Sequence, residues 1–275
     1  MSKNQVVTFH DAAIFDHPEW FSTAFVKVYR AMWPRLARRC RRVVTVSQYS
    51  QARLAQALDI PQRQIEVVPN GVAERFTPPA ADLLEGTAQK YGVEPGRYFV
   101  TLSTVEPRKN LKLVLDGWAR SVGRRPAGMK LLLLGGAGAK HIFASSDTGA
   151  EDLPQDVSLS GFVPDADLPA LLGGACALLY PSRYEGFGLP LVEAMACGTP
   201  AVTTRLTSLP EVGGDAVLYV DPDDAQALAD FIVQLASERS LRDDLSLAGL
   251  ERAKAFSWDN AARAMETILS RDLQL

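Results

Sequence analysis

Cysteine is scarce in this chain, and it has no long apolar run. The 275 residues include three cysteines, Cys40, Cys176 and Cys197. So few thiols argue against a disulfide framework and favour buried cysteines in a reducing compartment. The longest apolar stretches are shorter than the roughly 18 residues that a membrane-spanning helix needs, and the N-terminus lacks the residue order of a signal peptide. We therefore expect a cytoplasmic protein.

Acidic residues are missing from one long segment. Residues 20–58 contain no Asp or Glu but eight Lys and Arg, although the whole chain has a net charge of −3. Within this segment Phe25, Tyr29 and Trp33 recur at helical spacing, and Pro34 predicts a kink or a break. Two interpretations stay open: a solvated helix face, or a face attracted to the anionic inner surface of the cell membrane. We do not expect nucleic acid as a partner.

Short β-rich runs alternate with amphipathic stretches along most of the chain. This alternation predicts an α/β fold with parallel sheets covered by helices on both faces. Such sheets bind ligands at the carboxyl ends of their strands. The predicted strands are Val6–Phe9, Val43–Val46, Ile65–Val68, Tyr98–Ser103, Lys130–Leu134, Val157–Leu159, Ala175–Tyr180, Ala201–Thr203 and Val217–Val220.

Proline and glycine mark a change in composition between about residues 70 and 96. We interpret this stretch as a connection between two α/β regions. After Val220 the pattern is wholly helical, and Ser257 is expected to cap a last helix.

The most informative stretch is "RYEGFGLPLVEAMACGTPAV", residues 183–202. A strand is followed by a turn with Gly186 and Gly188, and a helix is expected to begin at Leu189 or Pro190. Glycines allow a close approach of the backbone, and a helix N-terminus favours a phosphate. We expect Glu193 in the first helical turn, where it would meet the diol of a ribose, while Glu185 would meet a group beyond the phosphates.

A structural interpretation of the same stretch is also open. Glu193 would then only stabilise the helix N-terminus, and the glycines would only form a tight turn. From the residues alone the two interpretations are balanced, although the spacing suggests a sugar nucleotide.

The stretch resembles the Glu-x7-Glu motif of the family 4 retaining glycosyltransferases, and the resemblance covers nearly the whole chain. It is strongest to the mannosyltransferase-like branch of that family. The matching segments, in order, are "SQYSQARLAQALDIPQRQIEVVPNGVAERFTP", "LSTVEPRKNLKLVLDGW", "LSGFVPDADLPALLGGACALLYPSRYEGFGLPLVEAMACGTPAV", "SLPEVGGDAVLYVDPDD" and "FSW".

The resemblance implies the GT-B fold, in which two Rossmann-like domains face a cleft. Residues 1–78 would form an incomplete N-terminal, acceptor-side domain. Residues 79–255 would form the nucleotide-sugar domain, and residues 256–275 a helix that returns toward the N-terminal domain.

The resemblance also implies roles for single residues. Glu193 would hold the ribose hydroxyls, and Glu185 the hydroxyls of the donor sugar. Lys109 would stabilise the leaving diphosphate, and His10 would lie near the donor sugar. The backbone from Gly186 through Phe187 and Gly188 to Leu189 would contact sugar and phosphate.

Other parts of the expected donor site match the family less completely. Phe162, Val163 and Asp165 match a loop that contacts the nucleotide base, although Phe162 could equally be a core residue. The family often has an arginine at the position of Ser103, so half of the usual phosphate clamp is missing; Arg108 is the candidate substitute.

The expected function is metal-independent transfer of a hexose from a nucleotide sugar to a glycan or lipid-linked acceptor. GDP-mannose is the preferred candidate for the donor, and UDP-glucose is the second. No cofactor is expected. The alternatives are a non-catalytic or truncated nucleotide-sugar-binding module that needs a partner chain, and a glycosidase that uses the two glutamates. The "DPDD" at residues 221–224 is interpreted as a helix cap, and "GGAGAK" at 135–140 lacks the spacing of a dinucleotide loop.

Overall fold

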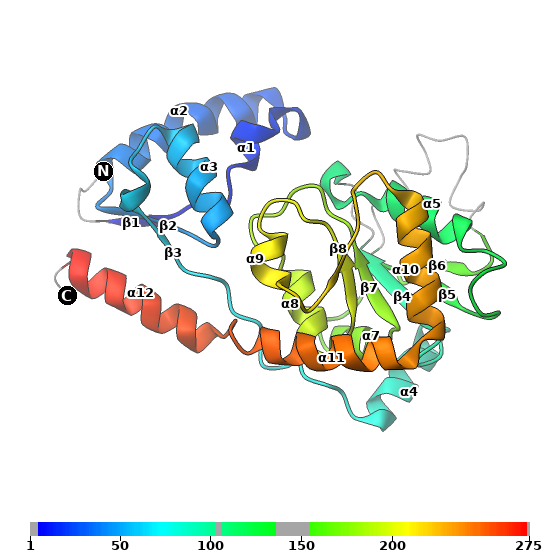
Figure 1. The fold of residues 1–275 in the computed structure, drawn as a ribbon. Helices are drawn as coiled ribbons and strands as arrows, with labels where there is room; N and C mark the ends of the chain where they lie inside the picture. The colour runs from blue at the N-terminus through cyan, green and yellow to red at the C-terminus, as the bar shows by residue number, and fades with distance from the viewer. Residues whose placement is uncertain (1–4, 103–105, 136–153, 274–275) are drawn as a thin grey trace.

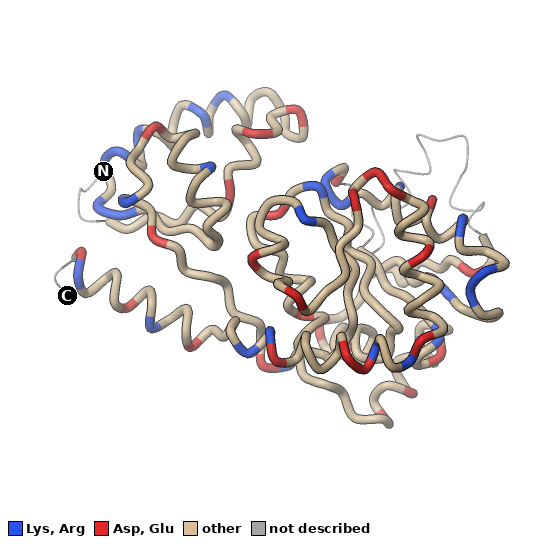
Figure 2. Tube along the Cα trace, viewed as in Figure 1, with Lys and Arg blue, Asp and Glu red and all other residues tan. Residues whose placement is uncertain are grey.

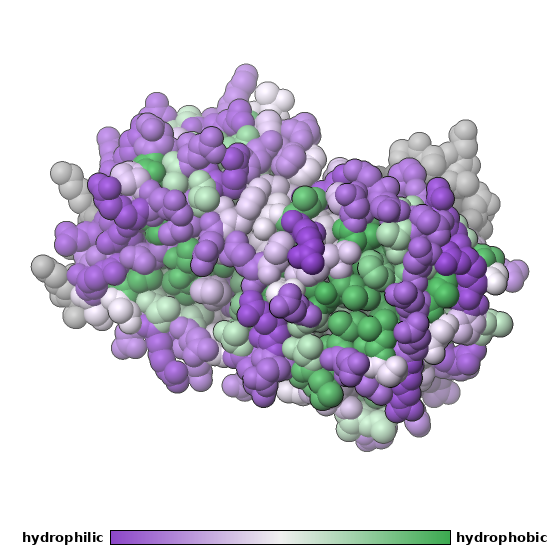
Figure 3. Space-filling model, viewed as in Figure 1, coloured by the Kyte–Doolittle hydropathy of each residue, from purple (hydrophilic) through white to green (hydrophobic). Residues whose placement is uncertain are grey.

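The computed structural model describes residues 5–102, 106–135 and 154–273. These residues form two lobes, each built on a parallel sheet with helices on both faces (Figure 1). On the face that the space-filling view shows, side chains of the two lobes meet across the space between their ribbons (Figure 3). Nine strands were predicted, and all nine are present with ends within two residues of the expected positions. The predicted α/β, GT-B-like arrangement is confirmed.

The smaller sheet lies in the N-terminal lobe and has the strand order β1-β2-β3. Val7 pairs with Val43, and Val43 pairs with Ile65, both in parallel register. Helices α2 and α3 cover one face, and the C-terminal helix α12 covers the other. The elements are β1 (Val6–Thr8), α1 (Ala13–Asp16), α2 (Thr23–Arg39), β2 (Arg42–Thr45), α3 (Gln48–Leu58), β3 (Ile65–Val67) and α12 (Trp258–Leu273), with 3-10 turns at Pro18–Trp20 and Gln62–Gln64.

The larger sheet has six parallel strands in the order β6-β5-β4-β7-β8-β9. Its strands are β4 (Tyr98–Leu102), β5 (Lys130–Leu134), β6 (Val157–Leu159), β7 (Ala177–Tyr180), β8 (Ala201–Thr203) and β9 (Leu218–Tyr219). Its helices are α4 (Ala81–Lys90), the 3-10 turn Pro107–Lys109, α5 (Leu111–Arg120), α7 (Leu168–Gly173), α8 (Leu189–Ala196), α9 (Leu209–Gly213), α10 (Ala225–Ser237) and α11 (Arg239–Ala253).

Two apolar layers hold the larger sheet between its helices. Tyr98 and Val100 of β4 point to the layer shared with α7 and α8, whereas Phe99 between them points to the layer shared with α5 and α10. This alternation follows from the period of two in a strand. Because β4 and β7 are parallel neighbours, the segments that follow them, residues 106–109 and 181–188, emerge at the same edge of the sheet.

The predicted connection at residues 70–96 contains a helix, α4, whose Ala88 belongs to the core of the larger lobe. The two crossings between the lobes lie side by side, because Val72 forms a parallel bridge with Ser257. Ser257 Oγ accepts a hydrogen bond from the Asn260 amide, as expected for the cap of α12. The proposed division of the chain at residues 78 and 255 stays a prediction.

Helix α2 differs from the prediction at Pro34. It runs unbroken from Thr23 to Arg39, so the alternative of a break is wrong, while the alternative of a kink stays a prediction. The missing amide of Pro34 removes only one helical hydrogen bond, while Trp33 and Leu36 pack on the core beside it. Lys and Arg follow the helix without any intervening acid (Figure 2). No described helix is both long and apolar enough to cross a membrane.

Candidate active site

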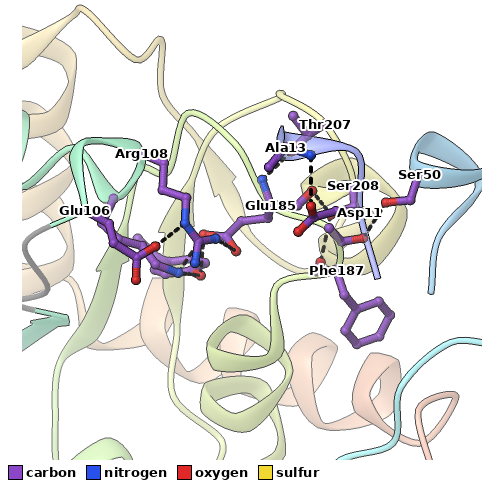
Figure 4. Close-up of polar contacts among 12 residues, drawn as sticks. Asp11, Ala13, Ser50, Glu106, Arg108, Glu185, Phe187, Thr207 and Ser208 are labelled. Carbon is purple, nitrogen blue, oxygen red and sulfur yellow. Dashed lines mark hydrogen bonds and ion pairs between the residues drawn. The ribbon is translucent and has the colours of Figure 1, made fainter. Parts of the chain in front are cut away.

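Residues 181–188 join β7 to α8, and we call residues 185–188 of this segment the glycine loop. Its carbonyl oxygens are held by serine hydroxyls. Ser208 Oγ donates to the carbonyls of Glu185 over 3.0 Å and of Phe187 over 2.9 Å (Figure 4). Ser47 Oγ, from the N-terminal lobe, donates to the carbonyl of Gly186 over 2.7 Å. Both lobes therefore fix the backbone of this loop.

The amide groups of the glycine loop beyond Glu185, unlike its carbonyl groups, are free to bind a ligand in the part of the chain that the structure describes. Within the described residues, the N–H groups of Gly186, Phe187, Gly188 and Leu189 make no hydrogen bond. Gly188 has a φ of 102°, which favours glycine, and helix α8 begins directly after it without a side-chain cap. Unpaired amides at a helix N-terminus attract an anion. The geometry thus provides a place for a phosphate group.

A cluster of charged side chains lies beside the loop. Glu185 Oε1 accepts from Lys109 Nζ over 2.8 Å and from the Tyr180 hydroxyl over 2.6 Å. Glu185 Oε2 pairs with Arg108 Nη1 over 3.0 Å, and Arg108 Nε also pairs with Glu106 (Figure 4). Two cations and two carboxylates balance formally, so a diphosphate would compete with the carboxylates for Lys109 and Arg108.

Burial controls the protonation of this cluster. Burial lowers the pKa of the Lys109 ammonium group, and the nearby Glu185 carboxylate opposes that shift. Burial also raises the pKa of Tyr180 well above its usual value, and Glu185 raises it further. Tyr180 therefore stays a hydrogen-bond donor at neutral pH. A carboxylate offers about four acceptor sites, and Arg108, Lys109 and Tyr180 occupy three of those of Glu185, so one is left for a further donor.

Glu193 lies deeper in α8 than predicted. It is the fifth residue of the helix, and the first turn contains no acidic residue, so its placement there was wrong. The helix begins at Leu189, as expected, but Pro190 to Val192 complete the first turn. The Glu193 side chain makes no hydrogen bond or ion pair with any residue that the structure describes. Burial raises its pKa, and Asp165 adds to this effect while Arg75 opposes it.

Asp165, one of the residues expected to contact the base, lies close enough to Glu193 for their charges to interact, and so does Arg75. Arg75 Nη2 pairs with Asp165 Oδ2 over 3.2 Å. Val163 packs against the main core, whereas Phe162 is 85% exposed. Phe162 is thus not a core residue, and its ring is available to a ligand.

His10 and Asp11 close the opposite side of the site. Together with Arg108, Glu185 and the glycine loop they line a cavity of about 190 Å³ between the lobes. Asp11 Oδ1 accepts from the Ala13 amide over 2.9 Å (Figure 4). All three residues predicted to act on the sugar or phosphate, Glu185, Lys109 and His10, belong to this one region.

Several residues of the site were not predicted. Tyr180 ends strand β7 and bonds both Glu185 and Lys109; its place at a strand end before a proline was the available signal. Ser47, Ser50 and Ser208 carried no recognisable signal, because their partners are backbone carbonyls distant in sequence.

The motifs that were set aside have structural roles where the structure describes them. Asp224 Oδ1 caps α10 through the Ala227 amide over 2.8 Å, and Asp223 pairs with Arg183. Among the described residues, no group of three or more His, Cys, Asp or Glu side chains is placed to hold a metal ion. Ser103 and residues 136–140 of "GGAGAK" lie outside the described residues. Cys40, Cys176 and Cys197 are buried free thiols.

The sequence matches two family profiles that together cover both lobes. Residues 87–252 match the profile described as "Glycosyl transferases group 1", and residues 1–76 match "Glycosyltransferase Family 4". The first match spans more than half of the chain. The chain belongs to this glycosyltransferase family.

Named relatives of this glycosyltransferase include several mannosyltransferases. O-antigen chain mannosyltransferase B of Escherichia coli is 33% identical over 257 residues, which cover 93% of this chain and 67% of that protein. O-antigen chain mannosyltransferase RfbU of Salmonella typhimurium is 28% identical, over 82% of this chain and 59% of that protein. The mannosyltransferase WbdA of Escherichia coli is 27% identical, but only 29% of it is covered. These relatives do not favour a non-catalytic binding module.

Solved structures share the fold of the glycosyltransferase. Anabaena Alr3699/HepE, in complex with UDP and glucose, superposes with a TM-score of 0.80 at 23% identity and covers 96% of this chain and 71% of its own. The sucrose-phosphate synthase of Thermosynechococcus elongatus gives a TM-score of 0.80 at 22% identity, over 98% and 67% of the two chains. At this level of identity the likeness shows the fold alone.

Proposed function

We propose that this chain transfers a mannosyl group from GDP-mannose to a glycan or lipid-linked acceptor, with retention of configuration and without a metal ion. The observation that carries the proposal is the set of unpaired amides at residues 186–189 beside the cations Lys109 and Arg108. Mannose is proposed because the relatives named above are mannosyltransferases. The guanine nucleotide is proposed from the resemblance of the sequence to the mannosyltransferase-like branch of the family.

We propose one orientation for the donor in this site. Its diphosphate would lie on the amides of the glycine loop, with the sugar toward Glu185 and His10. The ribose would extend to Glu193, whose carboxylate has no other partner in the described chain. The base would then reach the exposed ring of Phe162, beside Val163 and Asp165.

The reaction would exchange one bond for another on the same face of the sugar. The acceptor oxygen bonds to the anomeric carbon as the carbon–oxygen bond to the diphosphate breaks, and the electron pair leaves with the diphosphate. The hydroxyl proton passes to a phosphate oxygen. Lys109 and the amides of the glycine loop stabilise the charge that grows on the leaving group. Glu185 and His10 hold the sugar in position.

The test is titration calorimetry of the purified chain against GDP-mannose, GDP, UDP-glucose and UDP. We expect the guanine pair to bind without added metal. Glu193→Ala should weaken nucleotide binding, and Lys109→Ala should reduce both diphosphate affinity and turnover. Lys112→Ala is the matched control, because the Lys112 side chain is 82% exposed and, among the described residues, pairs with Asp116 alone. Equal affinity for all four ligands in every variant, or no binding by a folded sample, would refute the donor site.

A second cavity, of about 330 Å³, supports a place for the acceptor. It shares Asp11 and Arg108 with the donor cavity, and its wall includes Trp20 and Phe25. Trp20 is held by stacking on His17, with ring centroids 3.9 Å apart. A rigid aromatic wall beside a carboxylate suits a pyranose, which has apolar faces and hydroxyls at its edge.

Peripheral contact with the inner face of the cell membrane is the finer proposal for localisation. Along α2, Phe25, Val28 and Met32 are exposed by 41%, 57% and 38%, next to the basic side chains of residues 27–42. Apolar and basic side chains on one helix are typical of interfacial binding. The protein should co-sediment with vesicles that contain phosphatidylglycerol, whereas the Val28→Glu variant should stay in the supernatant. Equal sedimentation with neutral vesicles would count against this proposal.

A further inference from the structure

Glu211 of α9 reaches across to the N-terminal lobe and binds the start of helix α3. Its Oε2 accepts from the Gln48 amide over 2.8 Å, and its Oε1 accepts from the Tyr49 amide over 2.6 Å. The first amides of a helix have no partner within the helix, and the helix dipole favours a negative charge there. One carboxylate from the other lobe therefore satisfies two of these amides.

The same end of α3 also holds the glycine loop. Ser47 Oγ donates to the Gly186 carbonyl over 2.7 Å, and Ser50 Oγ donates to it over 3.2 Å. Ser208, which directly precedes α9, holds the carbonyls on either side of Gly186. The N-terminal ends of α3 and α9 therefore both hydrogen-bond the glycine loop, and Glu211 of α9 binds the N-terminus of α3 directly.

Glu211 itself is firmly anchored and lies away from the donor. The Arg252 guanidinium group donates to the backbone carbonyls of Glu211 and Val212, the latter over 2.9 Å. Glu211 lines a separate cavity of about 340 Å³ between the lobes, with Gln48 and Arg252, and does not line the cavity of Glu185. It acts on the site only through other residues.

We propose that Glu211 is a positioning residue for the proposed transfer reaction. By fixing the N-terminus of α3 it places the Ser47 and Ser50 hydroxyls on the Gly186 carbonyl. This contact in turn orients the loop amides toward the leaving diphosphate. A misplacement of about 1 Å in such a group costs up to about 100-fold in rate. The inference rests on the proposed function for its kinetic part, but the contact itself does not.

The kinetic test compares kcat and GDP affinity of Glu211→Gln and Glu211→Asp with those of the parent. Gln keeps one oxygen but loses the charge and the second acceptor, so we expect kcat to fall about tenfold or more, and GDP affinity to fall by a smaller factor. Asp keeps the charge and should restore part of kcat. Asp215→Ala, an exposed acid two residues beyond α9, is the matched control. An equal loss of kcat and GDP affinity, or no loss in either, overturns the proposal.

A second measurement does not need activity. Hydrogen exchange at the Gln48 and Tyr49 amides should quicken in Glu211→Gln, and the protection that GDP gives to residues 186–189 should shrink. Ser50→Ala should produce the same loss of GDP protection, and the double variant should lose no more than either single one. Unchanged exchange at Gln48 and Tyr49 overturns the positioning role. Quickened exchange at these amides, with no GDP binding by the parent, supports the contact and rejects the proposed function instead.

Discussion

Gly186 lies against Asp11 with no room for a side chain between them. A β-carbon built on Gly186 would stand 2.8 Å from the Asp11 β-carbon and 2.9 Å from the carbonyl oxygen of His10. The glycine loop of one lobe therefore touches the backbone of the other at the point where the proposed sugar site lies. Glycine is required here because a side chain would not fit, and not because of the backbone conformation: Gly186 is not among the described residues with a positive φ.

We predict that Gly186→Ala separates the loop from residues 10 and 11. Because a backbone carbonyl cannot move like the end of a flexible side chain, the variant should lose about 1–3 kcal/mol of stability and most of its turnover. Gly86→Ala is the control: Gly86 lies in α4 with open space around its Cα. That substitution should stabilise the protein by about 0.5–1 kcal/mol. Chemical denaturation measures both, and a neutral Gly186→Ala would contradict the close contact.

Tyr180→Phe should weaken the charged cluster without changing its charge. The lost hydroxyl leaves Glu185 Oε1 and Lys109 Nζ each with one partner fewer in a buried place. We expect a loss of about 1–2 kcal/mol in unfolding free energy and slower transfer. Tyr219→Phe removes a hydroxyl whose single hydrogen bond to a described residue goes to the Gly214 carbonyl, so it should leave transfer unchanged. Equal transfer rates for both variants would show that Tyr180 does not support the cluster.

Much of the fold could be predicted because its signals are local. Most residues in the strands of the larger sheet are apolar, and the start of α8 at Leu189 follows from the glycines and proline beside it. The meeting of Lys109 and Glu185 also follows, because parallel strands end at one edge of the sheet. The family resemblance, and not residue spacing, predicted that both residues belong to the site, and the pairing of β4 with β7 gives the structural reason.

Other parts of the site depend on contacts that no local pattern encodes. Glu211 and the serines at positions 47, 50 and 208 act on backbone groups from distant segments, so their side chains alone did not identify them. The placement of Glu193 in the first turn failed by one residue, because a shift of one residue at a helix start changes which turn a side chain occupies. The continuity of α2 through Pro34 depended on packing of Trp33 and Leu36, which propensity does not describe.

The stability of the protein should depend on pH through Glu193. Its raised pKa means that the folded state binds this proton more tightly than the unfolded state. The unfolding free energy therefore falls as pH rises from the ordinary value of 4.5 through the raised pKa. Glu193→Gln should remove this fall and be more stable than the parent at neutral pH, although its GDP affinity is lower. Denaturant unfolding at several pH values is the measurement. The exposed Glu85→Gln is the control, and parallel profiles for parent and Glu193→Gln would contradict the prediction.

The opposite pH dependence is expected where α12 joins the smaller sheet. Arg42 holds Asp272 through two hydrogen bonds, Nε to Oδ2 over 2.8 Å and Nη2 to Oδ1 over 3.3 Å. These bonds, with those from Arg271, hold the pKa of Asp272 well below its ordinary value of 3.8. The stabilisation is therefore present above that value and is lost as pH falls through the lowered pKa.

Asp272→Asn should lower the midpoint of thermal unfolding at neutral pH, because a charged two-bond contact is replaced by a neutral one. The difference from the parent should shrink in acid, where Asp272 also becomes neutral. Glu266→Gln alters an exposed carboxylate of the same helix and should shift neither the midpoint nor its pH dependence. A constant difference between Asp272→Asn and the parent across the acid range would mean that packing of Ile268 and Ala261 on Val44, and not the ion pair, holds α12 to the sheet.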